Sequence, residues 1–161
     1  LARALASDAP ILLMDEAYSA LDPLIRTDMQ TMLLDLQAEL KKTIVFITHD
    51  LDEALRLGDG IAILRDGEVV QAGDSQSILL RPADDYIRRF VRDVNRGRFL
   101  RVESLMEKAD GDGLPIAAGT ALEAAAALLT REDQDAAVVM DGSRRLGRLT
   151  LRQITLALSA E

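Results

Sequence analysis

Two carboxylates follow a short apolar segment near the beginning of the sequence. Residues 11–14 are all apolar, and Asp15 and Glu16 come directly after them. Such a run suits a buried parallel strand, although four residues alone do not exclude a helix. Open α/β sheets bind ligands at the carboxyl ends of their strands. There, Asp15 could hold Mg²⁺, directly or through water, and Glu16 could polarise a water that attacks a phosphate, which is the Walker B pattern.

His49, the single histidine of the chain, follows a second apolar segment, residues 43–47, which is rich in β-branched side chains. If the two segments are neighbouring strands, His49 lies beside Glu16. Its imidazole, neutral or protonated, could then donate a hydrogen bond to the same phosphate. Carboxylates at strand ends are common, and a lone histidine is usually a surface or core residue. Only the combination is specific.

Composition excludes several classes of function. The 161 residues are 48% apolar, so the chain can form a hydrophobic core, and the net charge of −8 argues against a nucleic-acid partner. The absence of cysteine excludes disulfides, thiolate metal sites and cysteine nucleophiles. No apolar run approaches the roughly 20 residues of a membrane helix, and no signal peptide is visible. We therefore expect a cytosolic protein.

The elements that must position these residues alternate in type. Asp22 followed by Pro23 predicts a helix from there to Lys42. Its apolar residues fall on one face at helical spacing. These are Ile25, Met29, Met32, Leu33, Leu36 and Leu40. With the strands at 11–14 and 43–47, this helix predicts the α/β class with a mostly parallel sheet.

Further signals follow along the chain. Asp50 and Glu53 are spaced as a capping box for a short helix that ends at Gly58. Asp66-Gly67 predicts a hairpin between residues 61–64 and 68–71. Residues 74–96 are expected to be helical with a break near Pro82. Seven arginines and three acids lie between residues 81 and 101. This indicates a solvated helix face, or contact with acidic lipid headgroups or another subunit.

From about residue 99 the pattern indicates a second, small unit. Thr120 and Glu123 are spaced as a capping box for an alanine-rich helix that ends at Thr130. Residues 136–140 and 146–149 flank a turn at Asp141-Gly142. Thr150 is expected to cap a closing helix over residues 151–158. The order predicts a βαββα arrangement of about 60 residues.

The first segment, to about residue 75, resembles the nucleotide-binding subunit of ATP-binding cassette (ABC) transporters. Residues 1–5 look like the helix that follows the signature motif of that family, and residues 11–16 look like its Walker B motif. The D-loop and the switch histidine correspond to Ser19, Ala20, Leu21, Asp22 and His49. The fold class implied is a partial P-loop NTPase domain, α/β with a mostly parallel sheet.

The resemblance implies roles for these residues. Asp15 would contact Mg²⁺ through water, Glu16 and His49 would be catalytic, and Ser19–Asp22 would lie at the nucleotide and dimer interface. The implied cofactors are ATP and Mg²⁺. The implied partners are a transmembrane permease subunit, a second copy of the ATPase subunit and, indirectly, a periplasmic or extracellular substrate-binding protein. The implied location is the cytoplasmic face of the plasma membrane, as a peripheral protein.

Several parts of the ABC pattern are absent from the sequence. No GxxxxGK[ST] occurs, and the nearest approach, at residues 142–149, lacks both the lysine and the hydroxyl. The signature motif and the Q-loop are also missing. The chain begins with Leu1, in the middle of a helical pattern. We therefore expect a C-terminal fragment of an ATPase subunit that, by itself, neither binds ATP tightly nor hydrolyses it.

Residues 100–161 look like one CBS (cystathionine β-synthase) motif, although a small packing extension is the alternative. Nucleotide-binding CBS modules often have an aspartate where this chain has Gln153, which puts adenosine binding in doubt. The expected domains are residues 1–75 (ATPase part), 76–99 (helical linker) and 100–161 (CBS-like).

An importer ATPase followed by a CBS region resembles the glycine betaine/proline (quaternary amine) uptake family. That family implies an ABC-type transport ATPase for osmoprotection. Alternatives are a non-catalytic regulatory or dimerisation module, the ATPase subunit of another ABC importer, and a DNA-repair ATPase. The acidic net charge and the CBS-like tail weigh against the last.

Overall fold

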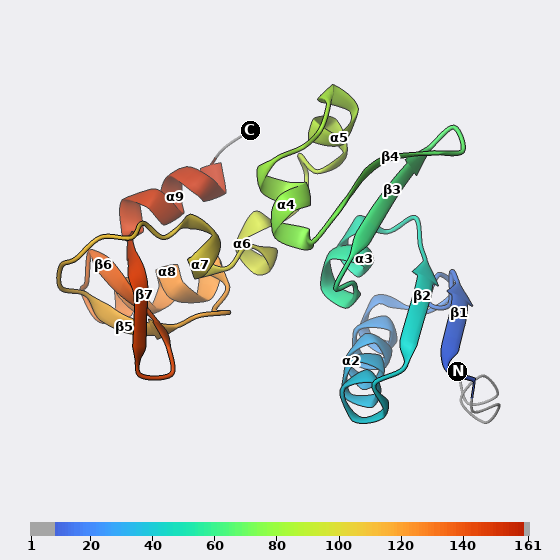
Figure 1. Cartoon of the computed structure of the whole chain (residues 1–161), viewed down its shortest axis with the longest axis horizontal. Coiled ribbons are helices and arrows are strands. Elements are labelled where there is room, and N and C mark those ends of the chain that lie inside the picture. The colour runs from blue at the N-terminus through green and yellow to red at the C-terminus, as the bar shows by residue number, and fades with distance from the viewer. Residues whose placement is uncertain (1–8, 160–161) are drawn as a thin grey trace. The chain divides into compact units, whose positions relative to one another are not determined.

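The computed structural model describes residues 9–159, and the helix expected over residues 1–6 lies outside them. The chain divides into two units, residues 1–59 and 60–161, which are described separately. Figure 1 shows the elements of both. Within residues 9–159, no helix is both long enough and apolar enough to span a membrane.

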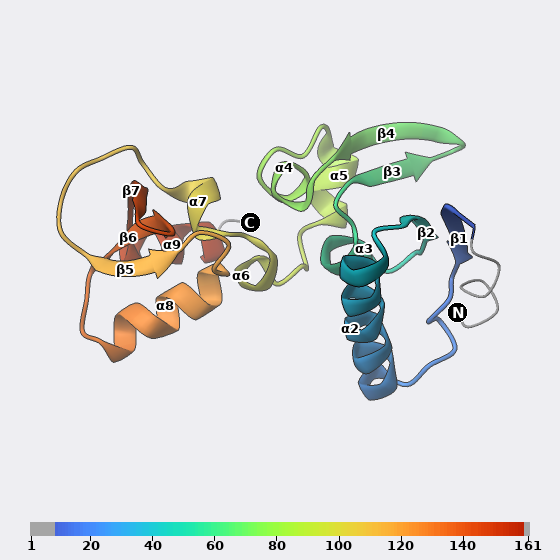
Figure 2. The same cartoon turned by 60° about the horizontal axis from the view of Figure 1, so that its bottom comes forward.

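The first unit contains the expected pair of strands. β1 (Ile11–Asp15) and β2 (Thr43–Ile47) pair in parallel, with Asp15 opposite Ile47 at the carboxyl end. Helix α2 (Pro23–Leu40) connects them, and α3 (Leu51–Leu57) follows β2 (Figures 1 and 2). The parallel strands joined by a helix confirm the predicted α/β class and bring residues 15–16 and 48–49 to one edge of the sheet.

The predicted helix boundaries have clear local causes. The Asp22 carboxylate accepts hydrogen bonds from the backbone N–H groups of Leu24 and Ile25, so α2 begins at Pro23 as expected. It ends where Lys41 adopts a left-handed conformation, with φ of 51°. The Asp50 carboxylate accepts from the backbone N–H of Glu53, which begins α3. The Asp22 cap is confirmed, and so is the Asp50 half of the predicted capping box. Its other half does not form, because the Asp50 backbone N–H donates to the Thr48 hydroxyl and the Glu53 carboxylate accepts from Gln30 and Thr48.

The core of the first unit lies on one face of its sheet. Met14, Tyr18 and Leu33 form its buried centre. The apolar face predicted for α2 is only partly buried. Ile25, Met32 and Leu40 are exposed, whereas Leu33 and the polar Gln30 are buried. The spacing of apolar residues indicates one possible contact face of the helix. Gln30 is buried because its side chain hydrogen-bonds to Glu53 and Arg56 of α3.

The second unit begins with the expected hairpin. β3 (Ile61–Arg65) and β4 (Glu68–Gly73) pair antiparallel, and Asp66 and Gly67 both have positive φ in the turn between them. Four short helices follow: α4 (Ser75–Leu80), α5 (Asp85–Phe90), α6 (Arg96–Phe99) and α7 (Val102–Leu105). Arg88 pairs with Asp85 and Arg92 with Asp93, so acids neighbouring in sequence partly neutralise this segment.

A three-stranded sheet completes the second unit and confirms the βαββα prediction. β5 (Leu114–Ala117) lies parallel to β6 (Ala136–Asp141), and β7 (Arg144–Thr150) lies antiparallel to β6, in the order β5-β6-β7. Helix α8 (Leu122–Arg131) connects β5 to β6 and runs beside the sheet (Figure 2). Helix α9 (Leu151–Ser159) follows β7 and packs against it.

One of the two capping predictions for this unit was wrong. Helix α8 is preceded by Ala121 and has no side-chain cap, because the Thr120 hydroxyl donates to the Ala117 carbonyl. Thr150, by contrast, accepts from the Gln153 backbone N–H, and the Gln153 side chain accepts from the Thr150 backbone N–H. This reciprocal pair is a capping box at the start of α9.

Candidate functional site

Glu16 and His49 meet where the two parallel strands end. The Glu16 backbone N–H donates to the Ile47 carbonyl at 2.9 Å, which extends the pairing one residue past β1. Glu16 itself has a φ of 43°, a left-handed conformation that is uncommon for a residue other than glycine. The sharp change of direction at this residue turns its side chain from the strand path towards the loop that carries His49.

The two side chains are in direct contact. His49 Nδ1 lies 2.9 Å from Glu16 Oε1, while the histidine and glutamate side chains remain 72% and 50% exposed. An ionised carboxylate only accepts hydrogen bonds, so the ring proton must be on Nδ1 when Glu16 is charged. In the neutral ring, Nε2 is then an acceptor. It follows that His49 can donate to a phosphate through Nε2 only as the imidazolium while this contact holds.

Asp15 provides a carboxylate for a metal ion. Its side chain is exposed and makes no hydrogen bond or ion pair within residues 9–159. No three acidic or histidine side chains gather as a metal cage in that same range. Mg²⁺ commonly keeps several waters and takes only one or two protein carboxylates together with substrate phosphates. A lone, unpaired Asp15 fits that mode of binding, although residues 9–159 do not form a complete cage.

The residues expected at the dimer interface form a tight turn. The Ser19 hydroxyl and backbone N–H both donate to the Glu16 carbonyl, at 2.9 and 3.2 Å. Leu21 packs on the core, Asp22 caps α2, and Ala20 is exposed. Ser19 and Asp22 therefore stabilise the turn that follows Glu16, and Ala20 lies exposed on the surface of that turn.

Tyr18, which was not identified from the sequence, anchors this turn to the core of the first unit. Tyr18 is 3% exposed, its ring lies tilted against that of Phe46 with the centroids 5.6 Å apart, and its hydroxyl donates a long hydrogen bond to the Met29 carbonyl. Burial, and secondarily the negative charge of Glu53, raise the pKa of its phenol above the ordinary value. A large aromatic residue between a carboxylate pair and a helix cap was the available signal.

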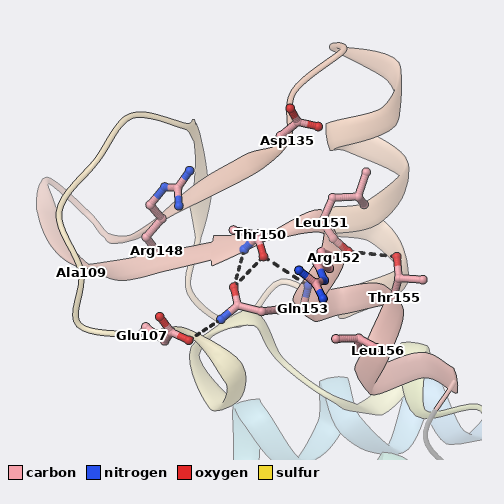
Figure 3. Close-up of a pocket in the computed structure, with 10 residues that line it drawn as sticks. All are labelled: Glu107, Ala109, Asp135, Arg148, Thr150, Leu151, Arg152, Gln153, Thr155 and Leu156. Atoms are coloured by element: carbon pink, nitrogen blue, oxygen red, sulfur yellow. Dashed lines mark hydrogen bonds between the residues drawn. The ribbon is translucent and has the colours of Figure 1, made fainter.

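The second unit contains a cavity of its own. It has a volume of about 880 Å³ and is bordered by Glu107, Arg148, Thr150, Arg152 and Gln153 among others (Figure 3). Both the nitrogen and the oxygen of the Gln153 amide have partners there. Its nitrogen donates to Glu107 Oε1 at 2.7 Å, and its oxygen accepts from the Thr150 backbone and hydroxyl. Gln153 therefore has little capacity left to bind a ligand.

Comparison with known proteins connects this arrangement to a group of transport proteins. No protein-family model matches the chain. The glycine betaine/carnitine transport ATP-binding protein GbuA of Listeria monocytogenes is 60% identical over 106 residues, which cover 66% of this chain and 27% of that protein. The glycine betaine/proline betaine transport system ATP-binding protein ProV of Escherichia coli is 44% identical over 162 residues, covering 100% of this chain and 40% of that protein. The chain is a homologue of these ABC-transporter ATP-binding subunits.

The homology confirms the resemblance expected from the sequence. This ABC homologue spans between about a quarter and two fifths of the length of the two relatives. Among solved structures, cbiO1 from Clostridium perfringens, part of the ABC transporter complex cbiONQ, matches with a TM-score of 0.45. The match has 26% identity and covers 57% of this chain and 36% of that chain. The CBS-like character of residues 100–161 and the domain limits 1–75, 76–99 and 100–161 stay predictions.

Proposed function

We propose that this chain is part of the ATP-hydrolysing subunit of an ABC importer of glycine betaine/proline-type osmolytes. The observation that carries the proposal is the 2.9 Å contact between Glu16 and His49 at the ends of two parallel strands. The homology to GbuA and ProV supports the transport class. The chain supplies the Walker B carboxylates, the D-loop turn and the switch histidine.

Each residue has a distinct task in this proposal. Glu16 accepts the proton of the attacking water, because its exposed carboxylate has one oxygen free of the His49 contact. His49 orients that carboxylate through Nδ1 and, as the imidazolium, donates to the phosphate through Nε2. Asp15 would hold Mg²⁺ through water, and the ion would supply neutralisation of the charge on the phosphate oxygens. The Ser19–Asp22 turn faces a second copy of the subunit.

The partners and location follow from the proposed class. The subunit works as a dimer on a transmembrane permease at the cytoplasmic face of the membrane, and a substrate-binding protein outside the membrane delivers the osmolyte to the permease. ATP binding closes the dimer and hydrolysis reopens it, which moves the permease between its two states.

Substitutions at the site test the catalytic assignment in the assembled transporter. Glu16→Gln removes the proton acceptor and keeps the shape, so we expect loss of roughly 100-fold or more in ATP turnover with nucleotide binding retained. His49→Ala should reduce turnover by a similar or smaller factor. Glu39→Gln, at an exposed glutamate of α2, is the matched control and should leave turnover unchanged. Full turnover in Glu16→Gln would contradict the assignment.

The 161-residue chain by itself provides a second test. It contains no GxxxxGK[ST] loop to cradle the β- and γ-phosphates. We therefore expect isothermal titration with Mg-ATP to detect no micromolar binding to this chain. Micromolar affinity would show that its own residues suffice for the nucleotide and would contradict the proposal that they form only part of the site.

The substrate class needs an uptake measurement. Vesicles that contain the assembled transporter should accumulate radiolabelled glycine betaine in an ATP-dependent manner, and Glu16→Gln should abolish that accumulation. Accumulation of a chemically unrelated solute in place of methylated amines would keep the ATPase proposal and overturn the osmolyte assignment.

A further inference from the structure

Arg26, near the start of α2, contacts both turns that carry the candidate site. Its side chain is 28% exposed. One terminal guanidinium nitrogen donates to the Leu21 carbonyl at 3.2 Å, within the turn that follows Glu16. The other donates to Asp50 Oδ2 at 3.3 Å, immediately after His49. A single planar group thus connects two segments more than twenty residues apart in sequence.

The Leu21 contact reaches Glu16 through the backbone of its turn. The Leu21 N–H donates to the Tyr18 carbonyl at 3.1 Å, and the Ser19 N–H donates to the Glu16 carbonyl. These consecutive bonds make residues 16–21 one continuous turn, and the buried Tyr18 anchors it to the core. Displacement of Leu21 therefore displaces the backbone from which the Glu16 carboxylate projects.

The Asp50 contact reaches His49 in a similar way. The Asp50 N–H donates to the Thr48 hydroxyl at 3.0 Å, and that hydroxyl donates to Glu53 Oε2 at 2.7 Å. His49 lies between Thr48 and Asp50, so its backbone is held on both sides. The second carboxylate oxygen of Asp50 accepts from the Glu53 N–H as the cap of α3.

The buried surroundings explain why a cation stands at this position. The Glu53 carboxylate is only 5% exposed, and Arg26 Nε lies 4.0 Å from its Oε1. Gln30 already donates to that oxygen, and Arg26 Nε is buried with no hydrogen-bond partner among residues 9–159. An unpaired buried donor is unfavourable. The two hydrogen bonds to the turns and the negative charge of Glu53 offset this cost and keep the guanidinium in place.

We propose that Arg26 is a positioning residue that fixes the Glu16 turn and the His49 turn relative to each other, so that the two side chains stay in contact. The proposal rests on the proposed function for its catalytic consequence. Arginine is required because its fork presents several donors in fixed directions, whereas the single nitrogen of lysine cannot reach both Leu21 and Asp50 in the same way.

Arg56 provides a matched control within the same helix pair. It lies on α3, and its two terminal nitrogens donate to the Gln30 and Thr31 side chains of α2, at 3.0 and 2.8 Å. Arg56 therefore joins α2 to α3 without bonding to either turn. Arg56→Lys should weaken helix packing and leave the contact between Glu16 and His49 intact.

The test uses the single histidine of the 161-residue chain, whose ring gives one set of nitrogen-15 signals. At a pH where the ring is neutral, long-range nitrogen–proton correlation spectra distinguish a proton on Nδ1 from one on Nε2. In water the Nε2 form is favoured, so the Nδ1 form reports the Glu16 contact. We expect the Nδ1 form to dominate in the unchanged chain and in Arg56→Lys. Arg26→Lys should shift the population to Nε2 by severalfold.

A second variant covers the case in which Arg26→Lys does not fold, as checked by circular dichroism. Asp50→Asn keeps a good cap for α3 but removes the charged partner of Arg26, and it should shift the population in the same direction by a smaller factor. An unchanged ratio in folded Arg26→Lys and Asp50→Asn, or an equal shift in Arg56→Lys, would overturn the proposal. A dominant Nε2 form in the unchanged chain would also overturn it.

Activity then separates this proposal from the proposed function. In the assembled transporter, Arg26→Lys should lower kcat for ATP by roughly 10-fold or more with little change in KM, because misplaced groups lose rate rather than affinity. Arg56→Lys should retain kcat. A tautomer shift in a transporter without ATPase activity would support the positioning role of Arg26 and refute the proposed function. Normal kcat in Arg26→Lys beside an inactive Glu16→Gln would refute the positioning role alone.

Discussion

Two of the three sheets in residues 9–159, the β1-β2 sheet and the β5-β6-β7 sheet, bury their apolar residues to different extents. On β1 and β2, only alternate residues are covered by α2 and α3, and the other face exposes Ile11, Leu13, Val45 and Ile47. On β6, the residues from 136 to 139 are buried on both faces, and Leu149 of β7 is completely buried. Helix α8 packs against β6, and α7 and α9 pack against β7.

The difference separates an accessible sheet that carries the candidate catalytic residues from a buried sheet that carries none of them. The sheet with the candidate catalytic residues has one covered face and an exposed strand-end edge, where Glu16 and His49 remain accessible. The three-stranded sheet is buried against helices. At its end, Thr150 of β7 and Gln153 of α9 bond to each other and begin α9. Within the residues that the structure describes, the central strand of the three-stranded sheet is buried on both faces, whereas the β1-β2 sheet is covered on one face.

The largest expected effect compares one substitution on the two sheets. Leu149→Ala removes a side chain that is 0% exposed and should lower the free energy of unfolding by about 2–5 kcal/mol. Leu13→Ala, at a position 77% exposed, should change it by less than about 0.5 kcal/mol. Denaturant unfolding of the 161-residue chain measures both. A large loss at Leu13 would show that the outer face of the first sheet is covered in solution.

Two glycine substitutions test how closely the backbone packs against β7 of the three-stranded sheet. The backbone of Glu107 pairs with Arg148 of β7 so closely that a Cβ at Gly147 would lie 2.4 Å from the Glu107 carbonyl oxygen. Gly147→Ala should therefore destabilise the chain by about 1–3 kcal/mol. Gly60→Ala meets no atom within 4 Å and should be neutral or slightly stabilising. Equal thermal midpoints for the two variants would rule out the close approach.

A threonine pair tests where helix capping acts in the second unit. Thr150→Ala removes the hydroxyl of the capping box and should cost about 1 kcal/mol. Thr120→Ala removes a hydroxyl that only donates to the Ala117 carbonyl, so its effect on unfolding should be smaller. If Thr120→Ala were the more damaging change in denaturant unfolding, the cap of α8 would have to be reassigned to Thr120.

The smallest effect at neutral pH concerns the core below the candidate site. Because the folded state raises the Tyr18 pKa, the protonated phenol is favoured by folding, and this stability is complete below the ordinary value of 10.0. It is lost progressively as the pH rises above 10. Tyr18→Phe should unfold much like the unchanged chain at pH 7 and lose less stability between pH 9 and 11. Parallel pH curves for the two would contradict the burial argument.

Much of the fold was predictable because its signals are local. The strands predicted at 11–14 and 43–47, the cap at Asp22 and the hairpin at Asp66-Gly67 depend on neighbouring residues, and all are confirmed. The errors arose where a local pattern has two structural outcomes. The spacing of Thr120 and Glu123 matches that of Thr150 and Gln153, yet only the second pair forms a capping box.

The sequence by itself determined the α/β order of elements, the carboxylate pair at the end of a strand and the resemblance to ABC ATPases, because these depend on residue type and short spacing. The tertiary structure alone decided three other features. These are the direct contact of His49 with Glu16, the burial of Gln30 and Glu53 between α2 and α3, and the position of Arg26 between the two turns. Each joins residues at least 23 positions apart or depends on which face of a helix is covered, and no local period encodes that choice.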